Sequence, residues 1–128
     1  MQKELQSESH TAMIVNNTPF SREKLRKILG RWGYTVVAEA ADGLEAVTKF
    51  CEFRPSVTFM DIIMPGKNGI DATKDIISCD GNAKVIMCSM SEHDSLIKAA
   101  RDAGAAGIIF KPFKAEQVIE VLDLVMEN

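Results

Sequence analysis

Polar residues that could carry chemistry follow four of the five short apolar runs in this 128-residue chain. Asn16 and Asn17 follow the first run, Asp61 the third, Ser89 the fourth and Lys111 the fifth. A carboxylate can act as a nucleophile or a metal ligand, a lysine ammonium supplies a compact positive charge, and a hydroxyl can donate a hydrogen bond. These side chains could therefore form one reactive site if the fold brings them together.

The apolar runs are predicted to be strands of a parallel sheet. Each has the length of one strand, and several are apolar throughout, as expected for strands buried on both faces. Longer amphipathic segments follow each run, so a strand is followed by a helix five times. Short connections between such units imply right-handed crossovers and helices on both faces of the sheet. The predicted strands cover residues 12–15, 35–38, 57–60, 84–88 and 107–110.

Capping residues mark the predicted helices. Thr18 and Pro19 are typical of a helix start, and Gly33 is expected to end that helix. Asp42 and Glu45 have the spacing of a capping box at the start of the second helix. The five helices are predicted over about residues 18–32, 42–51, 69–78, 91–103 and 114–126. The fold class is therefore α/β, a doubly wound five-stranded parallel sheet with five helices.

Doubly wound sheets collect functional groups at the carboxyl ends of their strands, where strand order reverses. We therefore expect Asp61, Ser89, Lys111 and the Asn16–Asn17 pair to converge in one crevice. The length suits one domain, predicted over residues 11–128, after a polar tail over residues 1–10. The tail lacks the apolar middle of a signal peptide, and no run approaches the length of a membrane span, so we expect a cytoplasmic protein without membrane contact.

Charge and cysteine spacing narrow the possible partners and cofactors. The net charge of -3 disfavours broad electrostatic binding to nucleic acid. Cys51, Cys79 and Cys88 are widely spaced and form no C-x-x-C pair, so neither a zinc clip nor a redox motif is indicated. Cys88 lies within an apolar run and is predicted to be a small buried side chain.

Two segments, residues 59–69 and 103–113, resemble the response-regulator receiver family. Asp61 ends the third strand and is followed by Met64-Pro65 and then by Asn68-Gly69. A hydroxyl residue, Ser89, ends the fourth strand, and Lys111-Pro112-Phe113 follow the fifth. The resemblance covers about residues 11–127 and is greatest to compact chemotaxis-type receivers. It implies a flavodoxin-like (β/α)5 fold with strand order 2-1-3-4-5 and a cis peptide before Pro112.

The resemblance also implies a function and a set of site residues. Asp61 would accept a phosphoryl group from a phosphohistidine of a histidine kinase, with Lys111 and Ser89 contacting phosphoryl oxygens. Magnesium would be bound by Asp61, by Asn17 and Asn16, and by the backbone carbonyl of Ile63. Such a receiver is a signalling phosphoacceptor that catalyses only its own phosphorylation and dephosphorylation, rather than an enzyme acting on a separate substrate.

The signal would pass to a downstream target protein through the fourth helix, fifth strand and last helix, with Ser89 and Ile108 at the switch positions. A flagellar motor switch is one candidate target, and the chain is expected to be a monomer. Lys98, Arg101 and Lys114 could contribute to the partner surface. The family often has an aromatic switch residue where this chain has Ile108, so a rotating ring cannot report phosphorylation here.

The first strand departs from the family pattern, because two acidic residues are normally found where Asn16 and Asn17 stand. Amide oxygens can bind magnesium only as neutral dipoles, so weak metal binding and impaired phosphorylation are expected. Fewer neighbouring negative charges would also make Asp61 easier to ionise. The chain is either a natural degenerate receiver or an ordinary receiver with both aspartates changed to amides. The intact remainder of the site modestly favours the second explanation.

Three other functions remain open from the sequence. A pseudo-receiver would bind its partner independently of phosphorylation. A flavin-binding protein would share the architecture, but no Ser/Thr/Gly-rich phosphate loop follows the first strand. A phosphohydrolase with an aspartyl nucleophile would turn over many phosphate esters. Ile63 and Met90 are bulkier than usual beside Asp61, and they would either shield an acyl phosphate from water or pack on each other.

Overall fold

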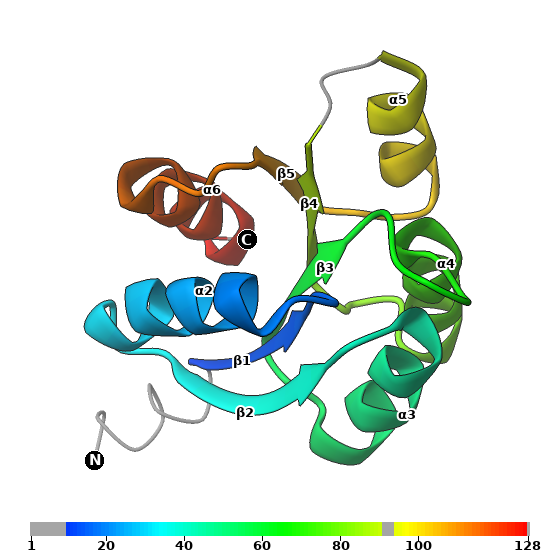
Figure 1. Cartoon of the computed structure of the whole chain (residues 1–128). Helices are drawn as coiled ribbons and strands as arrows, with labels where there is room; N and C mark the ends of the chain where they lie inside the picture. Colours follow the sequence, from blue (N-terminus) through cyan, green and yellow to red (C-terminus); the bar gives the residue numbers. More distant parts are fainter. Residues whose placement is uncertain (1–9, 91–93, 128) are drawn as a thin grey trace.

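A computed structural model of the chain describes residues 10–90 and 94–127, and strands and helices alternate along them (Figure 1). The strands are β1 (Thr11–Val15), β2 (Thr35–Ala40), β3 (Val57–Asp61), β4 (Val85–Ser89) and β5 (Gly107–Phe110). The helices are α2 (Pro19–Arg31), α3 (Gly43–Phe53), α4 (Gly69–Cys79), α5 (Asp94–Asp102) and α6 (Ala115–Met126). The predicted alternation is confirmed, and the boundaries agree to within two residues except at the start of α5.

All five strands are parallel and lie in the order β2-β1-β3-β4-β5, which confirms the expected topology. The chain runs outward from β1 to β2 and then returns to β3 on the other side of β1. Strand order therefore reverses at β1 and β3, and their carboxyl ends lie side by side. None of the described helices is both long and apolar enough to cross a membrane.

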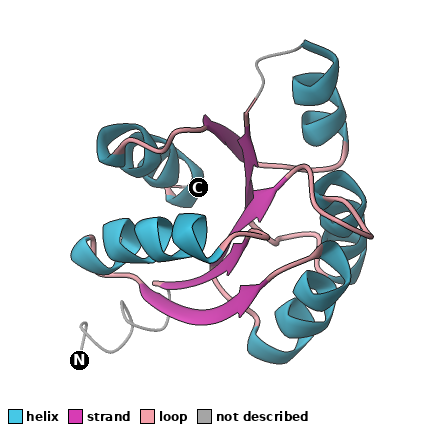
Figure 2. Ribbon diagram, viewed as in Figure 1, coloured by secondary structure: helices cyan, strands magenta, loops and turns pink. Residues whose placement is uncertain are grey.

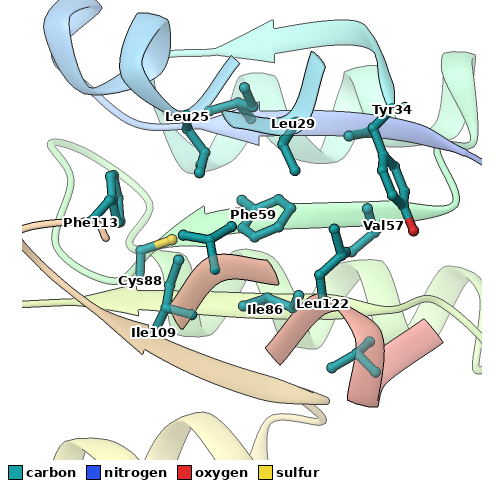
Figure 3. Close-up of a cluster of buried hydrophobic side chains, with 14 residues drawn as sticks. Leu25, Leu29, Tyr34, Val57, Phe59, Ile86, Cys88, Ile109, Phe113 and Leu122 are labelled. Carbon is teal, nitrogen blue, oxygen red and sulfur yellow. The ribbon is translucent and has the colours of Figure 1, made fainter. Parts of the chain in front are cut away.

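The helices form a layer on each face of the sheet. Helices α2 and α6 lie on one face, and α3, α4 and α5 lie on the other (Figures 1 and 2). Consecutive residues of β3 point to opposite faces, so Phe59 joins the core under α2 and α6 while Met60 joins the core under α3 and α4. Both side chains are fully buried, which explains why this strand is apolar throughout. Figure 3 shows Phe59 between the side chains of α2 and those of the neighbouring strands.

Helix ends follow the capping signals of the sequence. Gly33 has a φ of 88°, a left-handed conformation that glycine adopts without strain, and α2 ends two residues before it at Arg31. At the start of α3 the Asp42 carboxylate accepts a hydrogen bond of 2.8 Å from the Glu45 backbone N–H. The Glu45 carboxylate in turn accepts one from the Ala41 N–H, also at 2.8 Å. The start predicted for the fourth helix, at Ser91, lies outside the described residues.

His10, the last residue of the predicted tail, contacts the neighbouring strand and the core. The His10 backbone carbonyl accepts a hydrogen bond of 2.9 Å from the Thr35 N–H. Its ring meets Tyr34 edge-on with the ring centroids 4.8 Å apart, and Tyr34 is part of the buried core. His10 is therefore part of the folded domain, while the rest of the predicted tail lies outside the described residues.

Candidate functional site

A cavity of about 400 Å³ lies at the carboxyl ends of the strands. It brings together Asn17, Asp61, Ser89 and Lys111, as the sequence predicted, whereas Asn16 is not among its lining residues. The other lining residues are Thr18, Ser21, Ile62, Ile63, Cys88, Met90 and Leu96, of which the sequence placed only Ile63 and Met90 beside Asp61. Thr18 and Ser21 come from the first turn of α2 and its cap, so that helix start forms one wall.

Asp61 and Lys111 form an ion pair in this cavity. Asp61 is the last residue of β3 and is 5% exposed, and its Oδ1 lies 2.7 Å from Lys111 Nζ. The Lys111 backbone N–H donates to the Ser89 carbonyl at 2.9 Å, which fixes the chain just beyond β5 against the end of β4. The peptide between Lys111 and Pro112 is cis, as the resemblance predicted.

Ser89 ends β4 beside the same pair. In the β3–β4 register Asp61 lies opposite Cys88, so Ser89 is one position further toward the cavity mouth. The Ile62 N–H donates to the Cys88 carbonyl at 3.1 Å and holds the two strand ends together. Ser89 is 4% exposed and lines the cavity, so a nucleophile candidate, a cation and a hydroxyl come from three neighbouring strands.

Burial has the largest effect on the ionisation of Asp61. It raises the pKa of this carboxyl above its ordinary value of 3.8, although the hydrogen bond and charge of Lys111 act in the opposite direction. The depth of the carboxylate in the sheet, which the sequence could not show, is therefore the main influence on its pKa. Easier ionisation than in a receiver with two acidic residues at positions 16 and 17 stays a prediction.

The ionisation of Asp61 should therefore lower the free energy of unfolding as pH rises. The folded protein holds the Asp61 proton more tightly than the unfolded chain, so stability is lost as pH rises from 3.8 through the folded pKa. Asp61→Asn removes the ionisation and should be more stable than the parent at neutral pH. The difference in the free energy of unfolding between Asp61→Asn and the parent should disappear below pH 3.8. Urea unfolding of both proteins at a series of pH values measures it. A difference that stays constant with pH would contradict this account.

The two asparagines have different environments. Asn16 is 3% exposed, and its Oδ1 accepts hydrogen bonds from the Thr18 N–H at 2.9 Å and the Thr18 hydroxyl at 3.0 Å. Its backbone carbonyl accepts a third from Arg22 Nη1 at 2.7 Å. Asn17 is exposed and lines the cavity. Asn16 therefore stabilises the turn into α2, and Asn17 is the amide that shares the cavity with Asp61.

The donor set is a poor fit for magnesium. Asp61 is a single carboxylate already paired with Lys111, and the Asn16 oxygen is occupied by Thr18. Among the described residues there is no group of three His, Cys, Asp or Glu side chains that could hold a metal ion. Magnesium dehydrates reluctantly and favours charged oxygens, which leaves Asn17 and the Ile63 carbonyl as weak additions. Weak binding through Asp61, Asn17, Asn16 and Ile63 stays a prediction.

Ile63 and Met90 edge the cavity. Their side chains are 75% and 82% exposed, so neither is largely buried by the other. Ile108, at the predicted switch position in β5, lines a second hollow of about 350 Å³ with Ile97 and Arg101 of α5. Ile108, an aliphatic residue, therefore lines a hollow between α5 and β5.

The order of these site residues along the sheet matches a known family. The sequence family model of the response regulator receiver domain matches residues 12–123 of the chain. The chain belongs to the response regulator receiver domain family. Chemotaxis protein CheY of Thermotoga maritima is 43% identical over 113 residues, which are 88% of this receiver and 94% of that protein. Chemotaxis protein CheY of Bacillus subtilis is 41% identical over 115 residues, or 90% and 96% of the two chains.

A solved structure shares the fold of this receiver. The CheX–CheY–BeF3–Mg complex of Borrelia burgdorferi has a TM-score of 0.87 and 32% identity, covering 90% of this chain and 87% of that one. That protein was crystallised with a metal, a beryllofluoride group and a protein partner. This receiver differs from the family pattern in its Asn16–Asn17 pair, so its own metal binding and phosphorylation need separate argument.

Proposed function

We propose that this receiver accepts a phosphoryl group on Asp61 from a histidine kinase and does so slowly, because Asn16 and Asn17 weaken its cation site. The observation that carries the proposal is the 2.7 Å ion pair between Asp61 Oδ1 and Lys111 Nζ inside the 400 Å³ cavity. The pair holds a carboxylate nucleophile and the Lys111 ammonium where a phosphoryl group can enter. Asn17 supplies only a neutral dipole to the same space.

The chemistry follows from these side chains. An Asp61 oxygen attacks phosphorus as the bond between phosphorus and the histidine nitrogen of the donor breaks. Lys111 Nζ then moves from the carboxylate to a phosphoryl oxygen, and the Ser89 hydroxyl donates to another. Lys111 provides one positive charge, which neutralises only part of the negative charge on the transferred phosphoryl oxygens. That incomplete neutralisation is the physical reason for slow transfer.

The relay would use the surface formed by α5, β5 and α6. Lys98 pairs with Asp102 at 2.9 Å on α5, and Arg101 borders the hollow beside Ile108. An inward shift of Ser89 would change the packing beside this hollow without requiring a rotating aromatic ring. We propose a monomeric, cytoplasmic protein that presents this surface to a downstream target, for which a flagellar motor switch is one candidate.

Intact-mass analysis after incubation with acetyl phosphate and magnesium tests the proposal. We expect slow addition of a single group of about 80 Da that is lost in mild base, as an acyl phosphate would be. Asp61→Asn should abolish the adduct, whereas Asp123→Asn, which changes an exposed carboxylate of α6, should retain it. Complete absence of the adduct, or an adduct that survives in Asp61→Asn, would exclude Asp61 as the acceptor.

A phosphorylation-independent interaction module is the second candidate, and the poor magnesium site favours it. Such a module would bind its partner equally well with and without phosphodonor, and Asp61→Ala would not change its affinity. A phosphoreceiver should instead bind its partner with an affinity that depends on the donor and on Asp61. Comparing partner capture by the parent and Asp61→Ala, each with and without acetyl phosphate, separates the two functions.

A further inference from the structure

Two cysteines of neighbouring helices contact each other on the surface. Cys51 lies in the last turn of α3 and Cys79 is the last residue of α4, and their sulfur atoms are 3.6 Å apart. Both are exposed, whereas Cys88 is buried. The two thiols are 28 residues apart in the sequence and form no local motif, so only the packing of α3 against α4 brings them together (Figure 1).

We propose that Cys51 and Cys79 are an oxidation site that forms a reversible intramolecular disulfide when the protein meets a peroxide. The link would join the carboxyl-terminal ends of α3 and α4. It is independent of the proposed phosphoryl transfer, because Cys79 lies about 15 Å along α4 from the helix start that packs against Asp61. In a reducing compartment such a bond is transient and serves to sense oxidants.

The geometry favours closure with little rearrangement. A disulfide requires a sulfur–sulfur distance of about 2.05 Å, so the two sulfurs need to approach by about 1.5 Å. Both cysteines lie in last turns, Cys51 three residues before the cap Arg54 and Cys79 directly before the cap Asp80. Helix termini fray more readily than helix centres, so small backbone shifts there can accompany side-chain rotation.

A guanidinium contacts Cys79, one of the two exposed thiols. Arg54 Nη2 lies 3.7 Å from Cys79 Sγ, and positive charge beside a cysteine promotes its reaction with peroxide. The contact with Cys79 raises the pKa of the Cys51 thiol. Burial raises the pKa of Cys88, and its position in the core keeps it from oxidants. Cys79 is therefore assigned as the attacking sulfur and Cys51 as the resolving one.

The reaction consumes one peroxide for each disulfide. The Cys79 sulfur attacks a peroxide oxygen, the oxygen–oxygen bond breaks, and Cys79 becomes a sulfenic acid as one water leaves. The Cys51 sulfur then attacks the sulfenic sulfur, forming the sulfur–sulfur bond and releasing the second water. Two thiols lose two electrons and two protons in total, and the peroxide is reduced to two waters. An added dithiol reverses the reaction by exchange.

Thiol counting after hydrogen peroxide treatment tests the proposal. Alkylation under denaturing conditions should modify all three cysteines of the reduced protein but only Cys88 of the oxidised protein. The oxidised, unalkylated chain should be lighter by about 2 Da, and proteolysis should give one peptide pair joined through Cys51 and Cys79. Its melting temperature should rise by about 5–10 °C, and dithiothreitol should reverse all these changes.

A thiol-matched control is available on α4. In the double variant Ser78→Cys/Cys79→Ser the number of thiols is unchanged, but the exposed sulfur is rotated by about 100° around the helix. This variant should oxidise at least tenfold more slowly, and Arg54→Gln should slow the parent reaction several-fold. Equal rates in the shifted variant, dimers joined between chains, or sulfinic products without a link would overturn the proposal. An unchanged rate in Arg54→Gln would overturn the role given to that guanidinium.

Discussion

Replacing Asn16 and Asn17 with aspartate is expected to raise the affinity for magnesium by about a hundredfold. Each carboxylate that replaces an amide near the cation contributes on the order of 1–2 kcal/mol after solvent screening, and 1.4 kcal/mol is tenfold in affinity. The rate of Asp61 labelling by acetyl phosphate should rise with metal affinity, because the cation neutralises charge on the transferred oxygens. Isothermal titration with magnesium chloride measures the affinity without reference to phosphorylation.

The single variants should divide this gain unequally. Asn17 lines the cavity, whereas the Asn16 oxygen is hydrogen-bonded to Thr18, so Asn17→Asp should provide the larger share. Asn16→Asp keeps an acceptor for Thr18 and should leave stability nearly unchanged. An equal or larger gain from Asn16→Asp alone would contradict this assignment. Equal labelling of the parent and the doubly acidic variant would show that the amide pair does not limit phosphorylation.

Gly69→Ala is expected to destabilise the protein by about 3 kcal/mol, at the upper end of what overpacking a buried site produces. A Cβ at this position would overlap the carbonyl oxygen of Asp61 and lie 2.9 Å from the Cα of Ile62. These are backbone atoms, so no side-chain rotation can relieve the contact. The Gly69 N–H also donates to the Ile62 carbonyl at 2.8 Å, which holds the start of α4 against the end of β3.

Urea unfolding of Gly69→Ala and Gly30→Ala separates close packing from a general effect of removing glycine. Gly30 lies in α2, and a Cβ built there would have no atom within 4 Å. Gly30→Ala should therefore increase stability by about 0.5 kcal/mol through helix propensity. Because Asp61 must move to accommodate the added methyl group, Gly69→Ala should also lose most phosphodonor labelling. Wild-type stability in Gly69→Ala would contradict the close approach of the two backbones.

The strand pattern was predictable because burial on both faces leaves a direct mark on the sequence. Phe59 and Met60 point into different cores, so both positions of β3 must be apolar. Gly33, Asp42 and Glu45 act locally at helix ends, and their signals were confirmed. The contact of His10 with Tyr34 leaves no such mark, because these two residues are far apart in the sequence and meet only through packing.

The sequence alone determined the alternation of strands and helices and the convergence of Asp61, Ser89 and Lys111. Residue types at strand ends are sufficient for that inference, because parallel strands bring their carboxyl ends to one edge. Distances, burial and side-chain direction depend on how the layers pack, and only the tertiary structure decided them. It distinguished Asn16, bound to Thr18, from Asn17 in the cavity, and it showed that burial dominates the pKa of Asp61.

The contact between Cys51 and Cys79 likewise depends on packing, since it arises where the ends of α3 and α4 meet. The sequence predicts contacts within one element, and the parallel strand topology predicts which strand ends meet. Contacts between side chains of neighbouring helices depend on how whole helices pack on the sheet.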